Sequence, residues 1–106
     1  MMLSKVQPIS HLAVSTDLTM PVTYGITVVL IDTSVAAVDL TLRKGSESGV
    51  LLIMPVSVAN DWTVTLPSGT TANGEAGPFV FSIRAALWLV PVSDNYVVLN
   101  PSVSVP

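Results

Sequence analysis

The sequence predicts a small all-β protein, and three observations lead to this expectation. Apolar and polar residues alternate in residues 38–42 (VDLTL) and 62–66 (WTVTL), which is the period-two pattern of a half-buried strand. Valine, isoleucine and threonine, whose branched Cβ atoms suit a pleated surface, are abundant, whereas helix formers at a 3.6-residue period are scarce. Turn residues separate the apolar segments. We therefore expect a small antiparallel sandwich, jelly roll or barrel.

Longer apolar segments predict the remaining strands. Several are almost continuously apolar, which is typical of strands buried on both faces: residues 25–31, 50–54, 79–83 and 86–90. A shorter candidate strand, residues 96–99, lies near the C-terminal end. The turns expected between the strands are residues 43–49, 67–78 and 93–95.

The two ends of the chain differ from its middle. A chain of 106 residues fits one domain, which we place at residues 22–99. Residues 1–21 show no sustained period, and Pro8 and Pro21 favour extended backbone, so we expect an extended N-terminal arm. Residues 100–106 have the same character and form the expected C-terminal tail. Two interpretations of these ends stay open, frayed termini or extended arms that add to a neighbour's sheet.

Few charged residues are available to solvate the surface of this chain. They make up 10% of it, where soluble proteins carry about 25%, and the mean hydropathy is +0.69. A membrane is not the expected cover, because the uncharged stretches 18–31 and 48–60 are interrupted by proline and polar residues and fall short of a spanning helix. A signal peptide is not expected either, since polar residues follow Lys5. We therefore expect other protein chains to cover the surface.

The charge balance argues against nucleic acid as a partner. The net charge is −3, and the cations Lys5, Arg43, Lys44 and Arg84 are too few to neutralise a polyphosphate. The chain has no cysteine, so its fold depends on packing without disulfides. The expected partners are copies of this chain or a larger protein assembly.

Residues that could carry catalysis are sparse. His11 is the only histidine and lies in the expected arm, so neither a Ser-His-Asp triad nor a histidine metal site is predicted. Residues 68–77 contain glycines but lack the Lys-Ser or Lys-Thr of a phosphate-binding loop. We predict no enzymatic activity, no catalytic residue, no cofactor and no metal. The open alternative is a glycosidase-like pair of carboxylates formed in space by two of the scattered acids, Asp17, Asp32, Asp39, Glu47, Asp61, Glu75 and Asp94.

Three large aromatic residues are the candidate binding residues. Trp62 and Trp88 stand in strand patterns, where the first interpretation is burial in the core. The alternatives are anchors at a subunit interface, in which Trp and Tyr are enriched, or a stacking platform for sugar rings. Tyr96, in the last predicted strand, is open to the same alternatives.

Three segments that contain predicted strands resemble segments of known proteins. Residues 32–42 (DTSVAAVDLTL), 62–67 (WTVTLP) and 93–99 (SDNYVVL) resemble, in that order, segments of bacteriophage virion proteins, namely head fibres, capsid decoration or cement proteins, and tail-fibre modules. The likeness covers most of residues 25–99. Long fibres repeat such units and often carry a glycine-tryptophan turn where residues 94–96 (DNY) stand here. A short, unrepeated chain is therefore more similar to a capsid decoration protein.

The resemblance implies a function, a place and a set of partners. It implies a decoration or cement protein that binds the outer capsid surface as an oligomer and stabilises the shell, with the major capsid protein as partner. A homotrimer is the first expectation and a dimer the second, on analogy alone. The alternative is a head- or tail-fibre module that binds host-surface glycans or receptors through Trp62, Trp88 or Tyr96.

Overall fold

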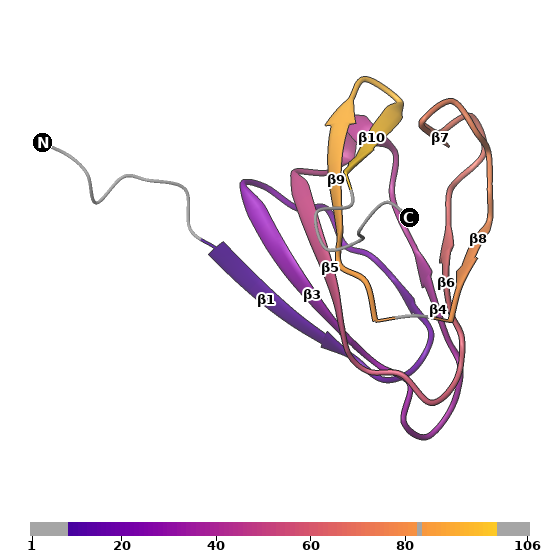
Figure 1. Cartoon of the computed structure of the whole chain (residues 1–106). Helices are drawn as coiled ribbons and strands as arrows, with labels where there is room; N and C mark the ends of the chain where they lie inside the picture. The colour runs from indigo at the N-terminus through magenta and orange to yellow at the C-terminus, as the bar shows by residue number, and fades with distance from the viewer. Residues whose placement is uncertain (1–8, 83, 100–106) are drawn as a thin grey trace, which may run out of the picture.

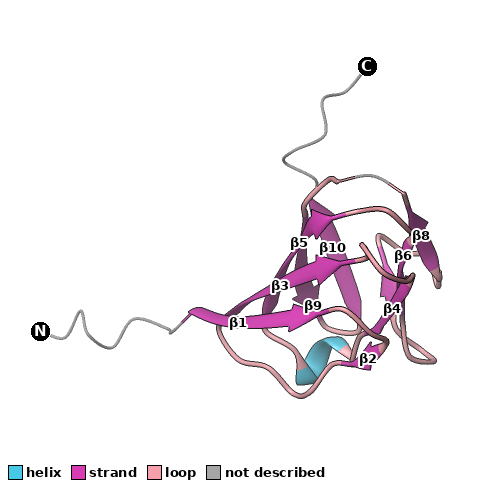
Figure 2. Cartoon of the chain, turned by 90° about the horizontal axis from the view of Figure 1, so that it is seen from below, coloured by secondary structure: helices cyan, strands magenta, loops and turns pink. Residues whose placement is uncertain are grey.

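The computed structural model describes residues 9–82 and 84–99, so the predicted C-terminal tail and the first part of the predicted arm lie outside the described residues. The described chain is all-β, as predicted, with a single 3-10 turn (Figures 1 and 2). In chain order its elements are β1 (Ile9–Val14), β2 (Leu18–Thr19), β3 (Ile26–Asp32), β4 (Val38–Thr41), η2 (Gly45–Glu47), β5 (Val50–Ser57), β6 (Trp62–Thr65), β7 (Thr71–Ala72), β8 (Phe79–Phe81), β9 (Leu87–Val92) and β10 (Asn95–Leu99).

The first half of the chain is a coil that alternates between two sheets. β1, β3 and β5 lie side by side in sheet A, and β2, β4 and β6 lie side by side in sheet B, so each turn of the coil adds one strand to each sheet. Pairing along the coil is parallel, with Ile9, Ile26 and Val50 as successive partners in sheet A. In sheet B, Val38 pairs with Trp62 in the same way. The arrangement resembles a short β-solenoid.

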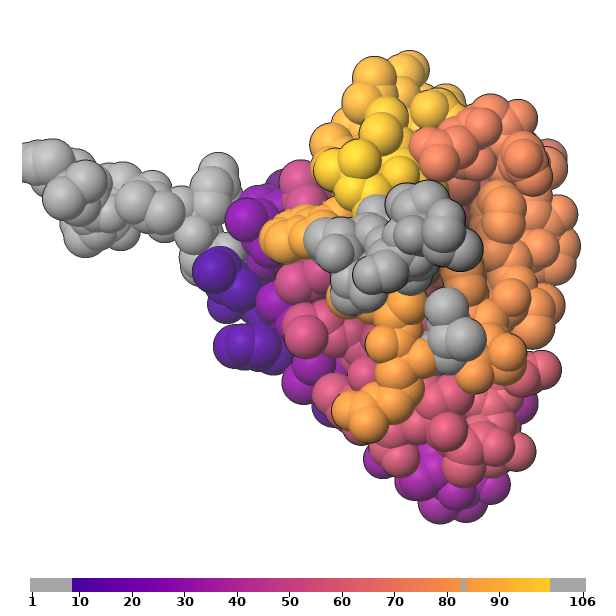
Figure 3. Space-filling view, in the orientation of Figure 1, coloured from indigo at the N-terminus to yellow at the C-terminus, as the bar shows by residue number. Residues whose placement is uncertain are grey.

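The second half of the chain completes both sheets. β9 pairs antiparallel with β5 and with β10, and β8 pairs antiparallel with β6. The strand orders are β1-β3-β5-β9-β10-β7 in sheet A and β2-β4-β6-β8 in sheet B. β1 and β7 are thus the two edges of sheet A, and Figure 3 shows the indigo atoms of β1 and the orange atoms around β7 and β8 on opposite sides of the molecule.

The predicted strand positions are confirmed more fully than the predicted pairing. The alternating segments are β4 and β6, the apolar segments are β3, β5, β8 and β9, and residues 96–99 belong to β10. However, the coil strands pair in parallel where antiparallel pairing was expected. Side-chain alternation reports which face of a strand is buried and carries no information on the direction of its neighbour. Here the opposite sheet's strand provides the long crossover that parallel neighbours require.

The domain boundary predicted at residue 22 is wrong, because residues from Ile9 onward belong to the folded domain. β1 pairs with β3 from Ile9 to Val14, and β2 pairs with β4. Val14 and Met20 are 4% and 2% exposed and pack in the core. Backbone pairing and apolar burial hold this segment in place. The predicted extended arm therefore does not include residues 9–21.

A single core fills the space between the two sheets. Its largest member, Trp62, has no exposed surface and stacks on Phe81 with ring centroids 4.3 Å apart. Buried residues alternate along β3 to β6 and β9, as period two requires. The rest of the buried core comes from both sheets and their connections: Val14, Met20, Val29, Ile31, Val38, Leu40, Leu42, Leu51, Ile53, Val64, Ala72, Leu87, Leu89 and Tyr96.

Thr33 joins two successive turns of the coil. Its side chain is fully buried, and its Oγ1 donates to the Asn60 carbonyl oxygen at 2.7 Å. The Asn60 Nδ2 donates in return to the Thr33 carbonyl oxygen at 2.8 Å, and the Thr33 amide donates to the Ser57 carbonyl oxygen at 2.9 Å. The segment after β3 is thereby held on the segment after β5.

We expect Thr33→Val to destabilise the protein by about 0.5–1.5 kcal/mol, because it removes the buried hydroxyl that donates to the Asn60 carbonyl oxygen and accepts from the Asn60 amide. The free energy of unfolding in urea measures the effect. Thr63→Val is the matched control, since Thr63 is half-exposed on sheet B and should change stability by less than about 0.5 kcal/mol. Equal stability of the two variants would contradict the role given to Thr33.

Candidate protein-interaction surface

Sheet A has apolar side chains on both of its faces. In β3 the buried residues Thr27, Val29 and Ile31 point into the core, so the residues between them point outward. The register of neighbouring strands places further apolar residues on that outer side, and we call the set the apolar face. It consists of Ile26, Val28 and Leu30 on β3, Val50, Leu52 and Met54 on β5, Trp88 and Val90 on β9, and Val97 and Leu99 on β10.

Within the described part of the chain, the apolar face is open to solvent. All ten of its residues are half-buried or exposed, and Met54 and Leu99 retain 38% and 52% of their surface. No described element packs over it, because the core contacts come from the inner side. The only charged residue in β3, β5, β9 and β10 is Asp32, the last residue of β3. Residues 25–31, 50–54 and 86–90, which form most of β3, β5 and β9, were predicted to be buried on both faces, and the described chain covers only their inner face.

The outer face of sheet B has the opposite character. Asp39 and Thr41 on β4, and Thr63 and Thr65 on β6, alternate with fully buried neighbours. Thr65 Oγ1 donates to Asp39 Oδ1 at 2.8 Å, so this face carries its own polar network. An antiparallel or mixed sheet with one solvated side normally looks like this. Sheet B is therefore suited to water, whereas the outer side of sheet A is suited to an apolar partner.

The structure separates the three candidate aromatic residues. Trp62 and Tyr96 have no exposed surface and belong to the core, so neither ring is open to a sugar or to a partner. Trp88 lies on the apolar face, directly opposite Leu52 in the β5–β9 register. Trp88 stands in a continuously apolar run, where period two cannot tell the inner from the outer face. It is the candidate aromatic that remains at the surface.

Tyr96 ties the last strand to the segment before η2. Its hydroxyl donates to the Arg43 carbonyl oxygen at 2.7 Å. Burial raises the pKa of the Tyr96 phenol above its ordinary value, and the negative charges of Asp94 and Glu47 act in the same direction, while a hydrogen bond with Ser48 lowers it. The folded chain therefore favours the neutral phenol.

This raised pKa predicts a loss of stability in alkali. Above pH 10 the phenol of the unfolded chain ionises while the folded one stays protonated, so the unfolded state is favoured as the pH rises toward the folded pKa. Urea midpoints measured from pH 8 to about 11 should fall less in Tyr96→Phe than in the unmodified chain. Tyr24→Phe, which alters a side chain with 78% of its surface exposed, should keep the full alkaline loss. The same pH profile in all three proteins would refute this account.

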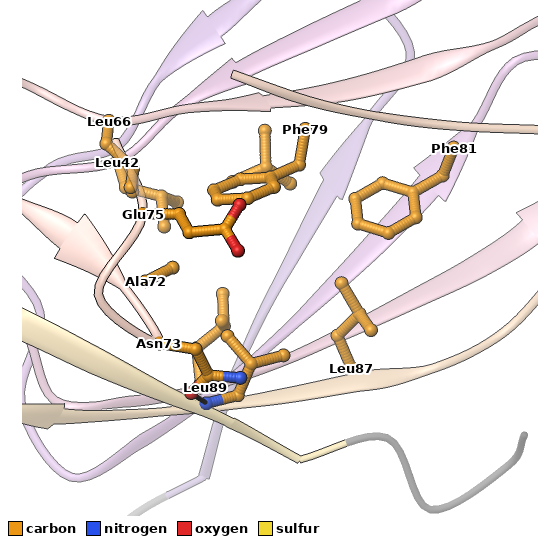
Figure 4. Close-up of a pocket in the computed structure, with 11 residues that line it drawn as sticks. Leu42, Leu66, Ala72, Asn73, Glu75, Phe79, Phe81, Leu87 and Leu89 are labelled. Atoms are coloured by element: carbon orange, nitrogen blue, oxygen red, sulfur yellow. Dashed lines mark hydrogen bonds between the residues drawn. The ribbon is translucent and has the colours of Figure 1, made fainter. Parts of the chain in front are cut away.

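A cavity of about 240 Å³ opens between the two sheets near β7 and β8. Figure 4 shows the Glu75 carboxylate directed into it among apolar side chains that include Phe79 and Leu89. Asn73 lies at the wall, where its Oδ1 accepts a hydrogen bond from the Val98 amide at 2.9 Å. Glu75 is the one titratable residue among the described residues that line the cavity. A glycosidase active site uses two carboxylates, whereas this cavity is lined by one, that of Glu75.

The other acids and His11 do not assemble into an enclosed site. Asp17 and Asp39 are brought together in an open hollow on sheet B, where Asp17 Oδ1 accepts a hydrogen bond from the Asp39 amide at 2.9 Å. His11 is exposed on the edge strand β1. Within residues 9–82 and 84–99, no group of three or more His, Asp or Glu side chains is placed to hold a metal ion.

Sequence comparisons with protein families and curated proteins give no information on the function of this chain. No protein-family model matches the chain, and no curated protein matches it either. Across the described part of the chain, no helix has the length and apolar character needed to cross a membrane.

Proposed function

We propose that this chain is a structural protein of the virion surface, a capsid decoration or cement protein that acts as an oligomer. The observation that supports the proposal is the apolar face, a nearly charge-free sheet surface on an otherwise solvated domain. Exposed apolar patches of this extent mark interaction sites. The virion is inferred from the resemblance to phage virion proteins, which residues 32–42, 62–67 and 93–99 carry.

In this role apolar area would be buried between copies of the protein, and the resulting oligomer would bind the shell. Removing apolar surface from water gains about 25 cal/mol per Å², and part of that gain is offset by the loss of translational and rotational freedom. The strand register of sheet A keeps these apolar side chains together on one side of the sheet. Such a role requires no catalytic step.

The proposal is tested by co-sedimentation with capsid shells. Purified protein should pellet with shells of the major capsid protein encoded in the same genome, saturate at a fixed ratio, and raise the temperature at which the shells disrupt. Shells that already carry the protein are the control and should bind none. A protein that stays in the supernatant at every concentration would overturn the proposal.

The fibre-module alternative is less well supported. A sugar-binding platform places polar groups around an exposed aromatic ring so that the sugar hydroxyls are hydrogen-bonded. Trp88 instead has Leu52 and Leu99 as its register partners and lies among apolar side chains. A glycan array on which Trp88→Ala abolishes specific binding would favour the fibre module over the decoration protein.

A further inference from the structure

We propose that the apolar face is covered by a second copy of this chain, packed sheet against sheet. The inference rests on the proposed function to the extent that both require this face to be buried. It goes further by naming the partner that buries it and the residues at the centre of the contact. Sheet B, with its polar outer face, would then remain free to face the shell or water.

The charge distribution favours a like partner. The apolar face contains no charged side chain, and the charged residues near it, Asp32, Arg84 and Asp94, lie at the ends of its strands or in the adjoining loops. A partner that placed a charge over the centre would bury it unpaired, which is costly. A second copy brings an equally uncharged centre and a polar rim, the usual anatomy of a subunit interface.

The area of the face is in the range that a stable dimer needs. Strands are spaced about 4.8 Å apart and rise about 3.3 Å per residue, so the apolar face together with the outer side of the edge strand β1 measures roughly 20–25 Å in each direction. On β1, His11 is the register partner of Val28 and lies at the rim. The projected area of this surface is on the order of 500 Å², and the corrugated surface of the side chains is larger. Standard interfaces bury about 600–1000 Å² on each partner. The face thus reaches this range once its rim is included.

The register identifies the centre of the contact. Leu52 on β5 and Trp88 on β9 are direct cross-strand partners, and β5 and β9 are the two middle strands of sheet A. Interface energy concentrates in central residues, with tryptophan prominent among them. Two sheets packed face to face lie about 10 Å apart, which lets the central side chains of both copies interdigitate.

The experiment compares the native molecular mass of three proteins by sedimentation equilibrium. The unmodified chain should have the mass of two copies, because the same face packed on itself closes at a dimer. Leu52→Lys places a charge at the centre of the face and should weaken self-association at least about 100-fold, so that the mass falls to one chain. Thr63→Lys puts the same side chain on the middle of sheet B and should leave the oligomer intact.

Several outcomes would overturn the inference: a monomeric unmodified chain at its highest soluble concentration, an oligomeric Leu52→Lys, or dissociation by Thr63→Lys. Circular dichroism shows whether each variant folds. Val97→Lys, on the exposed part of the face at β10, replaces Leu52→Lys if that variant does not fold.

The same proteins separate this inference from the proposed function. A monomer that still binds capsid shells would refute the self-association and leave the decoration role standing. An oligomer that is dissociated by Leu52→Lys but does not bind shells would refute the decoration role and leave the inference standing.

Discussion

Replacing Trp62 with alanine is expected to lower the melting temperature by at least about 12 °C, the largest effect among single substitutions in this chain. The Trp62 side chain has no exposed surface and stacks on Phe81. Truncation of a buried aromatic side chain costs about 3–5 kcal/mol, because the lost contacts leave a cavity that neighbours refill only in part. In a domain of this size, 1 kcal/mol corresponds to about 4–8 °C.

Thermal unfolding followed by circular dichroism measures this effect. Val80→Ala is the control, because Val80 pairs with Thr63 next to the Trp62–Phe81 stack but has 63% of its surface exposed. It should shift the melting temperature by no more than about 4 °C. A Trp62→Ala protein as stable as this control would show that the ring is not the centre of the core.

Gly45→Ala is expected to have the second largest effect, a loss of about 2–3 kcal/mol. Gly45 is buried in η2, and a Cβ atom there would overlap the carbonyl oxygen of Ser93 in the turn between β9 and β10. That turn cannot easily shift away from the added Cβ atom, because Ser93 already has a positive φ of 59°. The substitution therefore forces η2 and the β9–β10 hairpin apart.

The matched control lies in the same 3-10 turn. Ser46 is exposed, so Ser46→Ala should change the free energy of unfolding by less than about 0.5 kcal/mol. Urea denaturation of both variants, analysed with a common m-value, gives the comparison. If the two variants unfold at the same urea concentration, the close approach of η2 to the hairpin is not as described.

Strand positions could be predicted from the sequence where apolar and polar residues alternate, or where several apolar residues follow one another. Residues 38–42 and 62–66 show which side chains are buried, because period two relates the two faces of a strand directly to the sequence. β2 and β7 were missed because two residues are too short to show a period. β1 was missed because its exposed residues include polar Ser10 and His11 on the edge of a sheet.

The sequence alone determined the all-β class, the positions of the longer strands and the shortage of charge, because these depend on local composition and period. Only the tertiary structure decided the parallel coil, which depends on contacts between residues far apart in the chain. It also decided that Trp62 and Tyr96 point into the core while Trp88 lies outside. The apolar segments were interpreted as strands buried on both faces. The fold covers one of those faces, and the apolar face is the side that it leaves for a partner.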